Sequence, residues 1–272
     1  MSEDRSSWDF LSGTSGQVHG VRATTQAVLR DAVCDVAALA RLTPWRLRHA
    51  ARSWPQRRVL ALALERTDVP NVLLAARAEL ERSHHHLQFA ATPVGSRGKF
   101  ENLNALLRAH PATGHDWLLV LDDDVALPDG FLDVFVFLAE RFDFSLAQPA
   151  HRWRSHAAFA VTRRRPGVIA RETRFVEIGP VCGLRADTFH ELLPFPPLRF
   201  GWGLDAHWSA IADARGWRLG VIDAIPVRHG LRRIASSYAW DDAAAEGREF
   251  LSDRPYTPSA EAQRTLSSHA SW

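Results

Sequence analysis

Short apolar runs and amphipathic segments alternate along the chain from residue 58 onward. The first apolar run, Val59-Leu-Ala-Leu-Ala-Leu64, is followed by a segment with apolar residues three and four positions apart, and the pattern then recurs. The short runs predict strands, and the amphipathic segments predict helices. Such alternation is typical of right-handed βαβ units in a mainly parallel sheet. The expected strands are 59–64, 87–91, 117–121 and 144–148, and the expected helices are 71–82, 99–109 and 130–142.

The pattern changes in the second half of the chain, where Pro, Gly and aromatic residues become frequent. The elements expected there are strands at 157–162, 175–185 and 219–227 and helices at 204–215 and 238–251. Upstream of the alternation, residues 21–54 have helical apolar spacing, and residues 1–20 are rich in Ser and Gly and expected to be poorly ordered. We therefore expect an α/β domain at 56–252, an N-terminal tail and helical extension at 1–55, and a flexible C-terminal tail at 253–272.

The composition is that of an ordinary globular protein of 272 residues, with 46% hydrophobic residues and a formal net charge of +2. A charge so near neutrality gives no reason to expect nucleic acid as a partner. Cys34 and Cys182 match no metal or redox spacing, which is typical of a reduced cytosolic setting. Residues 1–10 lack the pattern of a signal peptide, and no apolar run approaches the roughly 20 residues of a membrane span. We expect a soluble, cytoplasmic protein.

An arginine-rich stretch at 41–58 has two interpretations. It contains six arginines among Trp45, Leu47 and Trp54. A basic amphipathic segment of this kind can rest on an anionic membrane, which would make the protein membrane-peripheral. The alternative is a solvated helix that packs on the main domain.

The expected strand at 117–121 runs directly into Asp122-Asp123-Asp124. Carboxylates packed this closely repel one another, so a positive partner is expected across them. A divalent metal that carries a phosphorylated ligand would fill this role. Phosphatases of the haloacid dehalogenase type also begin with Asp-x-Asp, but they continue with x-Thr or x-Val, and Ala126 stands here. A third alternative is an acidic strand–helix loop without a ligand.

The order of the motifs around the triplet is more specific than the triplet itself. Lys99 and, five residues later, Asn104 precede the acidic strand, and Pro128 follows it. Over residues 58–230 the chain resembles the nucleotide-sugar-dependent glycosyltransferases of the GT-A fold, particularly family 2 and its relatives. The resemblance implies Mn²⁺ or Mg²⁺ as cofactor and a nucleotide diphospho-sugar as donor. It also implies that Asp122 contacts the ribose or sugar and shares the metal, that Asp124 holds the metal, and that Asp123 shares either task.

A second segment, Phe200-Gly-Trp-Gly-Leu-Asp205, is similar to the Gly-Trp-Gly-x-(Glu/Asp)-Asp segment of galactosyltransferase-like GT-A enzymes. The resemblance implies that Trp202 stacks on a sugar and that Asp205 is the general base for the acceptor hydroxyl in an inverting transfer. Leu204 stands where the family has another carboxylate, so one acid remains here. The alternative is that Trp202 is a core aromatic and Asp205 caps the helix at 206–215.

The remaining candidate residues are placed by the same resemblance. His229, after the last core strand, would complete the metal site, and Arg228 or Arg232 could bind a diphosphate bidentately. A further set would contact the nucleotide: Glu65, Thr92, Arg97, Lys99 and Asn104. His84-His85-His86 has no acidic neighbour in the sequence and is expected to be a solvated surface tract. Glu177 and Cys182 are weaker candidates for the acceptor cleft.

The sequence thus predicts a metal-dependent glycosyltransferase that moves a sugar from a nucleotide-sugar donor to a saccharide or other hydroxyl acceptor. One rival is a sugar-phosphate nucleotidyltransferase, but residues 64–70 lack the glycine-rich phosphate loop of that class. Another rival is a non-catalytic module that binds a sugar or a nucleotide. It would not need Asp122, Asp124, Asp205 and His229 together.

Overall fold

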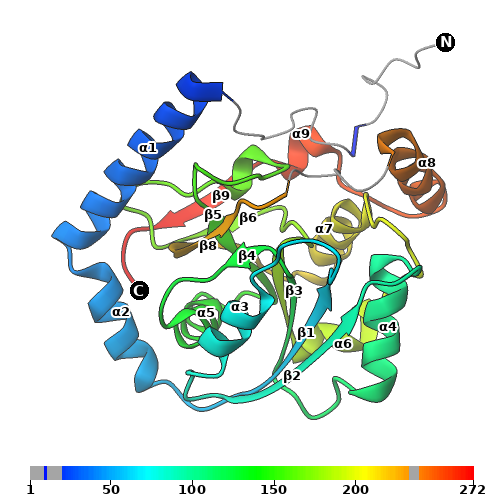
Figure 1. Cartoon of the computed structure of the whole chain (residues 1–272), viewed down its shortest axis with the longest axis horizontal. Helices are drawn as coiled ribbons and strands as arrows, with labels where there is room; N and C mark the ends of the chain where they lie inside the picture. The colour runs from blue at the N-terminus through cyan, green and yellow to red at the C-terminus, as the bar shows by residue number, and fades with distance from the viewer. Residues whose placement is uncertain (1–8, 11–19, 233–238) are drawn as a thin grey trace.

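The computed structural model describes residues 9–10, 20–232 and 239–272 (Figure 1). Its central sheet has the strand order β2-β1-β3-β7-β5-β8-β6-β9, and the short strand β4 pairs with β8. The strands are β1 (Arg58–Glu65), β2 (His86–Pro93), β3 (Trp117–Asp122), β4 (Val125–Ala126), β5 (Leu146–His151), β6 (Ala170–Thr173), β7 (Val181–Arg185), β8 (Leu219–His229) and β9 (Thr265–His269).

Along the main path of the sheet, strands β7 and β6 run against the others. β1 pairs in parallel with β2 and β3, and β5 pairs in parallel with β8, whereas β7 is antiparallel to both β3 and β5. The predicted α/β class with a mainly parallel sheet is therefore confirmed. The helices are α1 (Gly20–Ala40), α2 (Thr43–Arg52), α3 (Leu73–Leu80), α4 (Lys99–Ala109), α5 (Phe131–Arg141), α6 (Phe189–Leu192), α7 (Leu204–Arg215), α8 (Trp240–Leu251) and α9 (Ser259–Ala262).

The two faces of the sheet are covered by different helices. Side chains alternate along β1, so Val59, Ala61 and Ala63 belong to one buried cluster, while Leu60 and Leu62 belong to another. The first cluster includes residues of α2, α3 and α5, and the second includes residues of α4, α7 and α8. A strand buried on both faces reads as a continuous apolar run, which is why β1 was predictable from the sequence.

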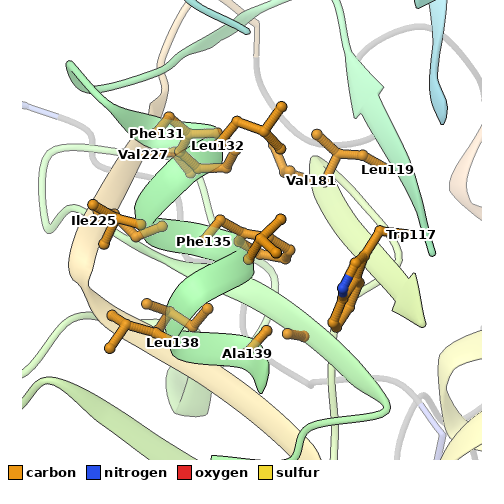
Figure 2. Close-up of a cluster of buried hydrophobic side chains, with 14 of the residues drawn as sticks. Trp117, Leu119, Phe131, Leu132, Phe135, Leu138, Ala139, Val181, Ile225 and Val227 are labelled. Atoms are coloured by element: carbon orange, nitrogen blue, oxygen red, sulfur yellow. The ribbon is translucent and has the colours of Figure 1, made fainter. Parts of the chain in front are cut away.

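Helix α5 lies at the centre of the first cluster. Every residue from Phe131 to Ala139 is buried, as expected for a helix enclosed on all sides. Its side chains meet Trp117 and Leu119 of β3, as Figure 2 shows, and the Trp117 and Phe135 rings are in edge contact with centroids 6.0 Å apart. Helix α2 covers the outer side of α5 with Leu47. The arginine-rich stretch therefore includes a helix that packs on the domain.

The expected helix at 21–54 is two helices. The chain turns at Leu42, whose φ of 51° lies in the left-handed region, and Pro44 follows in the first turn of α2. The expectation for residues 1–20 falls almost entirely outside the described residues. None of the helices in the described ranges is long and apolar enough to cross a membrane.

The edge of the sheet differs most from the sequence-based expectation. Residues 157–162 form a loop that ends in a 3₁₀ turn, and β6 and β9 form the sheet edge beyond β8. The C-terminal segment, expected to be a flexible tail, thus contributes strand β9. Three of the four residues of β6 are polar, Arg171, Glu172 and Thr173. The strand can be buried because the fully buried Arg171 donates hydrogen bonds to Asp223 of β8 and to the carbonyls of Val161 and Arg163.

Candidate active site

A cleft of about 670 Å³ opens at the carboxyl ends of β1, β2 and β3. The register pairs Leu64 with Asp122 and Glu65 with Pro93, so the ends of the three strands are level. Ligands of open α/β sheets bind at this edge. Nine of the predicted site residues line the cleft: Glu65, Arg97, Lys99, Asp122, Asp123, Asp124, Trp202, Asp205 and His229.

The three aspartates of the triplet have three different environments. Asp122 is the most accessible of them and forms an ion pair with Lys99, with 2.7 Å between Nζ and Oδ1. Gly179 lies beside this pair. A Cβ at Gly179 would be 3.1 Å from Lys99 Nζ and 3.3 Å from Asp122 Oδ2. The only lysine of the chain thus places its charge directly at the opening of the cleft.

Asp123 is buried and connects loops around the cleft. Its carboxylate accepts a hydrogen bond from Arg66 N at 2.6 Å and also contacts Arg232, while its carbonyl accepts from Val72 N at 2.8 Å. These bonds hold the loop between β1 and α3. In this structure the described contacts of Asp123 are those of a loop-fixing residue.

Asp124 is buried and faces His229. Its Oδ2 lies 3.1 Å from His229 Nε2 and 3.3 Å from Arg232 Nε, yet neither contact has hydrogen-bond geometry. Burial raises the pKa of Asp124, but attraction to His229 and Arg232 outweighs burial and lowers that pKa overall. Burial lowers the pKa of His229, and the Asp124 carboxylate outweighs it and raises that pKa. Both shifts favour the charged forms of the pair.

The donor atoms of Asp124 and His229 fit a divalent metal. A carboxylate oxygen that is buried without an aligned donor, beside an imidazole nitrogen, offers two ligands that Mn²⁺ accepts. Asp122 is the third predicted ligand, and its carboxylate is turned to Lys99. Within the described part of the chain, Asp122, Asp124 and His229 do not form a set of ligand atoms that all lie within 4.8 Å of one another. A complete site would need Asp122 to turn from Lys99, or oxygens from a ligand.

The segment before α7 brings Asp205 to the cleft. Gly201 has a φ of +86°, and a Cβ there would lie 2.0 Å from the Phe100 ring, so only glycine fits. Helix α7 begins at Leu204 after Gly203, which places Asp205 inside the first turn. Its Oδ1 accepts from Ala206 N at 2.9 Å. The residue that precedes the helix is Gly203, so Asp205 is not its N-cap.

Asp205 is enclosed and has no cationic partner among the groups that shift its pKa. Burial, and then repulsion by Glu177, raise the pKa of Asp205 to about 8. Glu177 is held by Ala158 N at 3.4 Å, Thr162 Oγ1 at 3.5 Å and His151 Nε2 at 3.2 Å. A carboxylate with a pKa near neutrality suits proton transfer, since a general base works best near the operating pH. Glu177 is buried as well and lines the same cleft.

The raised pKa predicts a pH-dependent stability. Between about pH 4 and pH 8 the folded chain keeps a proton on Asp205 that the unfolded chain has released, so the free energy of unfolding falls as the pH rises. The slope is about 1.4 kcal/mol per pH unit. Asp205→Asn removes this dependence, because Asn remains neutral. Thermal unfolding should therefore show the variant gaining stability over the wild type from pH 5 to pH 8, and a constant difference would contradict the buried, protonated carboxyl.

Trp202 has one edge in the cleft and the other in the core. It packs against buried residues of two clusters and meets Trp240 of α8 in an edge contact with ring centroids 4.8 Å apart. It also lines the cleft. Both sequence-based interpretations of Trp202, as a core aromatic and as a ligand platform, are compatible with this placement.

Several candidates lie outside the lining of the cleft. Thr92 and Arg228 are absent from it, whereas Arg232 is present. Cys182 is buried in the core, and burial raises its pKa to about 12. Asn104 is turned to the loop after α6, where its side chain donates to Phe195 O at 2.7 Å and accepts from Phe195 N at 2.9 Å. Asn104 therefore supports the wall of the cleft rather than its surface.

Removing the Asn104 side chain should destabilise the fold moderately. Asn104→Ala leaves the Phe195 N–H and C=O without these partners, which is expected to cost about 2 kcal/mol of unfolding free energy. Arg108→Ala, an exposed change on the same helix, should stay within about 0.5 kcal/mol of the wild type. Urea unfolding measures both. Equal stabilities of the two variants would show that the paired hydrogen bonds contribute nothing.

The cleft also contains residues that the sequence did not single out. Arg66, Asp68 and Arg199 line it, and Arg199 NH1 donates to Ser96 O at 3.3 Å. The buried Asn102 shapes the neighbouring loop by donating to Val94 O at 2.8 Å and to Gly98 O at 3.2 Å. Arg199 directly precedes the Phe200-Gly-Trp-Gly segment, which was the available signal for it.

The His84–His86 tract was expected to be a solvated surface run, but the structure gives it an acidic partner. His85 is buried, and Asp133 of α5 accepts hydrogen bonds from Ser83 Oγ and from His84 N. Over residues 9–10, 20–232 and 239–272, His84, His85 and Asp133 are the set of three metal-capable side chains whose ligand atoms lie within 4.8 Å of one another. The acidic partner comes from a helix 49 residues away in the chain.

Contacts with the backbone assign the hydrogen positions on the two imidazole rings of this set. His84 Nε2 lies 3.1 Å from Trp54 O, and because a carbonyl only accepts, this nitrogen carries hydrogen. The other nitrogen, Nδ1, lies 3.1 Å from Asp133 Oδ1 without hydrogen-bond geometry. His85 Nδ1 accepts from Arg57 N, which leaves the hydrogen on Nε2. These polar contacts connect the segment before β2 to α5 and to the start of β1.

Comparisons with known proteins give structural likenesses at low sequence identity. No protein-family model and no curated protein matches the sequence. A197 from STIV aligns with a TM-score of 0.45 and 11% identity, over 64% of this chain and 86% of that one. GalNAc-T7, solved with UDP, GalNAc and Mn²⁺, aligns with a TM-score of 0.47 and 11% identity, over 72% of this chain and 48% of that one. TarS 1–349 from S. aureus, in complex with UDP-GlcNAc, aligns with a TM-score of 0.46 and 10% identity, over 71% and 65%.

Proposed function

We propose that the cleft binds a nucleotide diphospho-sugar and transfers its sugar to a hydroxyl acceptor. The observation that carries this proposal is the arrangement of charge within one cleft. Asp124 and His229, which can bind a metal ion, line the cleft, and so does Asp205, a buried acid with a raised pKa. Metal-assisted departure of a diphosphate and removal of an acceptor proton need these two kinds of group.

The donor diphosphate would be bound at the strand ends. Asp124 and His229 would hold a divalent cation, and such an ion would neutralise the charge that develops on the departing diphosphate. Lys99 and Arg232 contribute further positive charge there. Arg232 can meet phosphate oxygens bidentately. Because it also lies against Asp124, it would exchange that contact for the phosphate when a cation binds.

The transfer itself would be an inverting displacement with Asp205 as base. The acceptor oxygen forms a bond to the anomeric carbon while the bond from that carbon to the diphosphate breaks. The acceptor proton passes to Asp205, which therefore must be ionised at the start. Burial, and then the nearby Glu177, keep the pKa of Asp205 high, so the carboxylate is a strong proton acceptor. Trp202 would present its exposed edge to a sugar ring.

The proposal is tested by thermal unfolding with Mn²⁺ and a panel of UDP-, GDP- and dTDP-sugars. A ligand bound to the folded state raises the unfolding temperature by mass action. We expect at least one nucleotide sugar to stabilise the protein with Mn²⁺ and less without it. If no member of the panel stabilises the protein with the metal present, the proposal is wrong.

A further inference from the structure

Helix α1 presents its apolar side to solvent. Surface helices of globular proteins normally turn their apolar side to the core. The large apolar side chains of α1, with those of Leu42 and Trp45 that continue the surface onto α2, are between 43% and 86% exposed. We call this set the α1–α2 apolar surface: Val21, Val28, Leu29, Val33, Val36, Leu39, Leu42 and Trp45. Figure 1 shows α1 along the outer edge of the molecule.

The orientation of α1 is fixed by polar contacts on its opposite side. Asp31 is buried and accepts hydrogen bonds from the backbone nitrogens of Trp153 and Arg154, both at 2.9 Å. Asp35 forms ion pairs with Arg152 and Arg164, the latter at 2.7 Å. Rotating the helix to bury its apolar side would break these contacts and leave the Asp31 carboxylate without its hydrogen-bond donors. The outward apolar side is therefore built into the packing of the helix.

The α1–α2 apolar surface is large enough to indicate a binding partner. Single exposed apolar residues are normal on a protein, whereas several large ones gathered along one helix and the turn after it mark an interaction site. A helix of 21 residues is about 32 Å long, so the surface is an extended strip. Because α1 is not apolar enough to cross a bilayer, a membrane partner would have to be bound at its interface.

The charged residues of α1 and α2 favour an anionic partner for the α1–α2 apolar surface. The exposed charged residues of 20–52 are all arginines, namely Arg22, Arg30, Arg41, Arg46 and Arg52. Of the two carboxylates of α1, Asp31 is buried, and Asp35, whose side chain is 39% exposed, is neutralised by Arg152 and Arg164. Helix α2 contains no carboxylate. A second copy of the chain would bring a second set of exposed arginines to the same interface, which is unfavourable. Arg30 and Arg46 lie over the rings of Trp153 and Trp272, and Arg41 donates to Gly167 O. Exposed apolar side chains, a Trp and an excess of exposed arginines together match the interface of an anionic bilayer.

We propose that the α1–α2 apolar surface docks the protein on anionic phospholipid membranes, with α1 lying in the plane of the interface. Val, Leu and Trp side chains enter the headgroup–acyl boundary, and the arginines contact lipid phosphates. The sequence-based hypothesis placed membrane contact at 41–58, whereas the structure moves its centre to α1. Docking uses no residue of the cleft and is independent of the proposed transfer reaction.

Flotation with vesicles tests the proposal without any donor or metal. The wild-type chain should float with vesicles of phosphatidylcholine and phosphatidylglycerol at a ratio of 3:1 and much less with phosphatidylcholine alone. The double variant Leu29→Asp, Val36→Asp should bind at least about tenfold more weakly. The control is Leu74→Asp, which places one such charge on an 81% exposed leucine of α3 and should bind as the wild type does. Arg22→Ser and Arg52→Ser should each weaken binding about fivefold, and Arg108→Ser on α4 should not.

Two results would overturn docking on lipid. The first is no flotation of the folded wild type with anionic vesicles, or equal flotation of the double variant and the control. The second is a wild-type dimer by light scattering that the double variant abolishes, together with no vesicle binding, which would assign the surface to self-association. Circular dichroism of each variant shows that it is folded, and the double variant should fold because both changes are on exposed positions.

Discussion

Asp205→Asn is expected to lower the rate of sugar transfer by about a thousandfold while leaving donor affinity nearly unchanged. Asn has the same shape but cannot accept the acceptor proton, and general bases contribute roughly 10² to 10⁴ in rate. The hydrogen bond from Ala206 N to the side-chain oxygen is retained, so the geometry of the first turn of α7 should survive. The measurement is release of nucleoside diphosphate in the presence of an acceptor, beside donor binding by calorimetry.

A matched control for this variant lies on the same helix. Asp213→Asn makes the same chemical change at a carboxylate that is outside the cleft and pairs with Arg174 on the surface. It should retain nearly full activity. Transfer by the wild type should also rise with pH towards a plateau above about 8, as the buried carboxyl ionises. An Asp205→Asn variant with undiminished turnover would remove Asp205 as the base.

Asp124→Asn is expected to weaken metal-dependent donor binding by at least about 100-fold. The substitution removes the negative charge that, with His229, makes this pair suitable for a divalent cation. Even partners of metal ligands typically change affinity by about 10- to 100-fold, so loss of a ligand charge should reach the upper value. Binding of a nucleoside diphosphate is measured by calorimetry at saturating Mn²⁺ and again with a chelator.

The control for this variant is Asp129→Asn, an exposed carboxylate a few residues further along the chain. It should bind as the wild type does. Thermal unfolding without metal reports whether Asp124→Asn is folded, because the loss of attraction to His229 and Arg232 could act on the fold itself. A folded Asp124→Asn protein with normal Mn²⁺-dependent binding would place the metal elsewhere.

The sequence predicts the centre of this fold better than its edges for a physical reason. β1 and β3 are buried on both faces, so their apolar runs are unmistakable, and α4 and α7 begin and end where the pattern indicates. Strand β6, which lies between β8 and the edge strand β9, carries the buried Arg171, whose charge is neutralised by Asp223 of β8. A pattern that treats arginine as solvated cannot find such a strand.

The site was predictable to the extent that its residues follow strands or glycine-rich loops. Asp122 and Asp124 end or follow β3, and Asp205 follows two glycines, so their types and positions indicated chemistry. The roles of Asn104 and of the His84–His85 pair depend on partners far along the chain, Phe195 and Asp133. The sequence also does not predict that the apolar side of α1 faces solvent. Helical spacing shows that a helix has an apolar side, but not whether polar contacts on the opposite side bind that helix to the domain.

The central claim is that Asp124 and His229 hold a divalent cation that binds a nucleoside diphosphate in the cleft. Crystals grown with Mn²⁺ and a nucleoside diphosphate, measured near the manganese absorption edge, locate the metal directly by anomalous scattering. We expect a peak in contact with Asp124 and His229, with the phosphates beside Lys99 and Arg232. A manganese peak only at His84, His85 and Asp133, or a diphosphate bound outside the cleft, would contradict it.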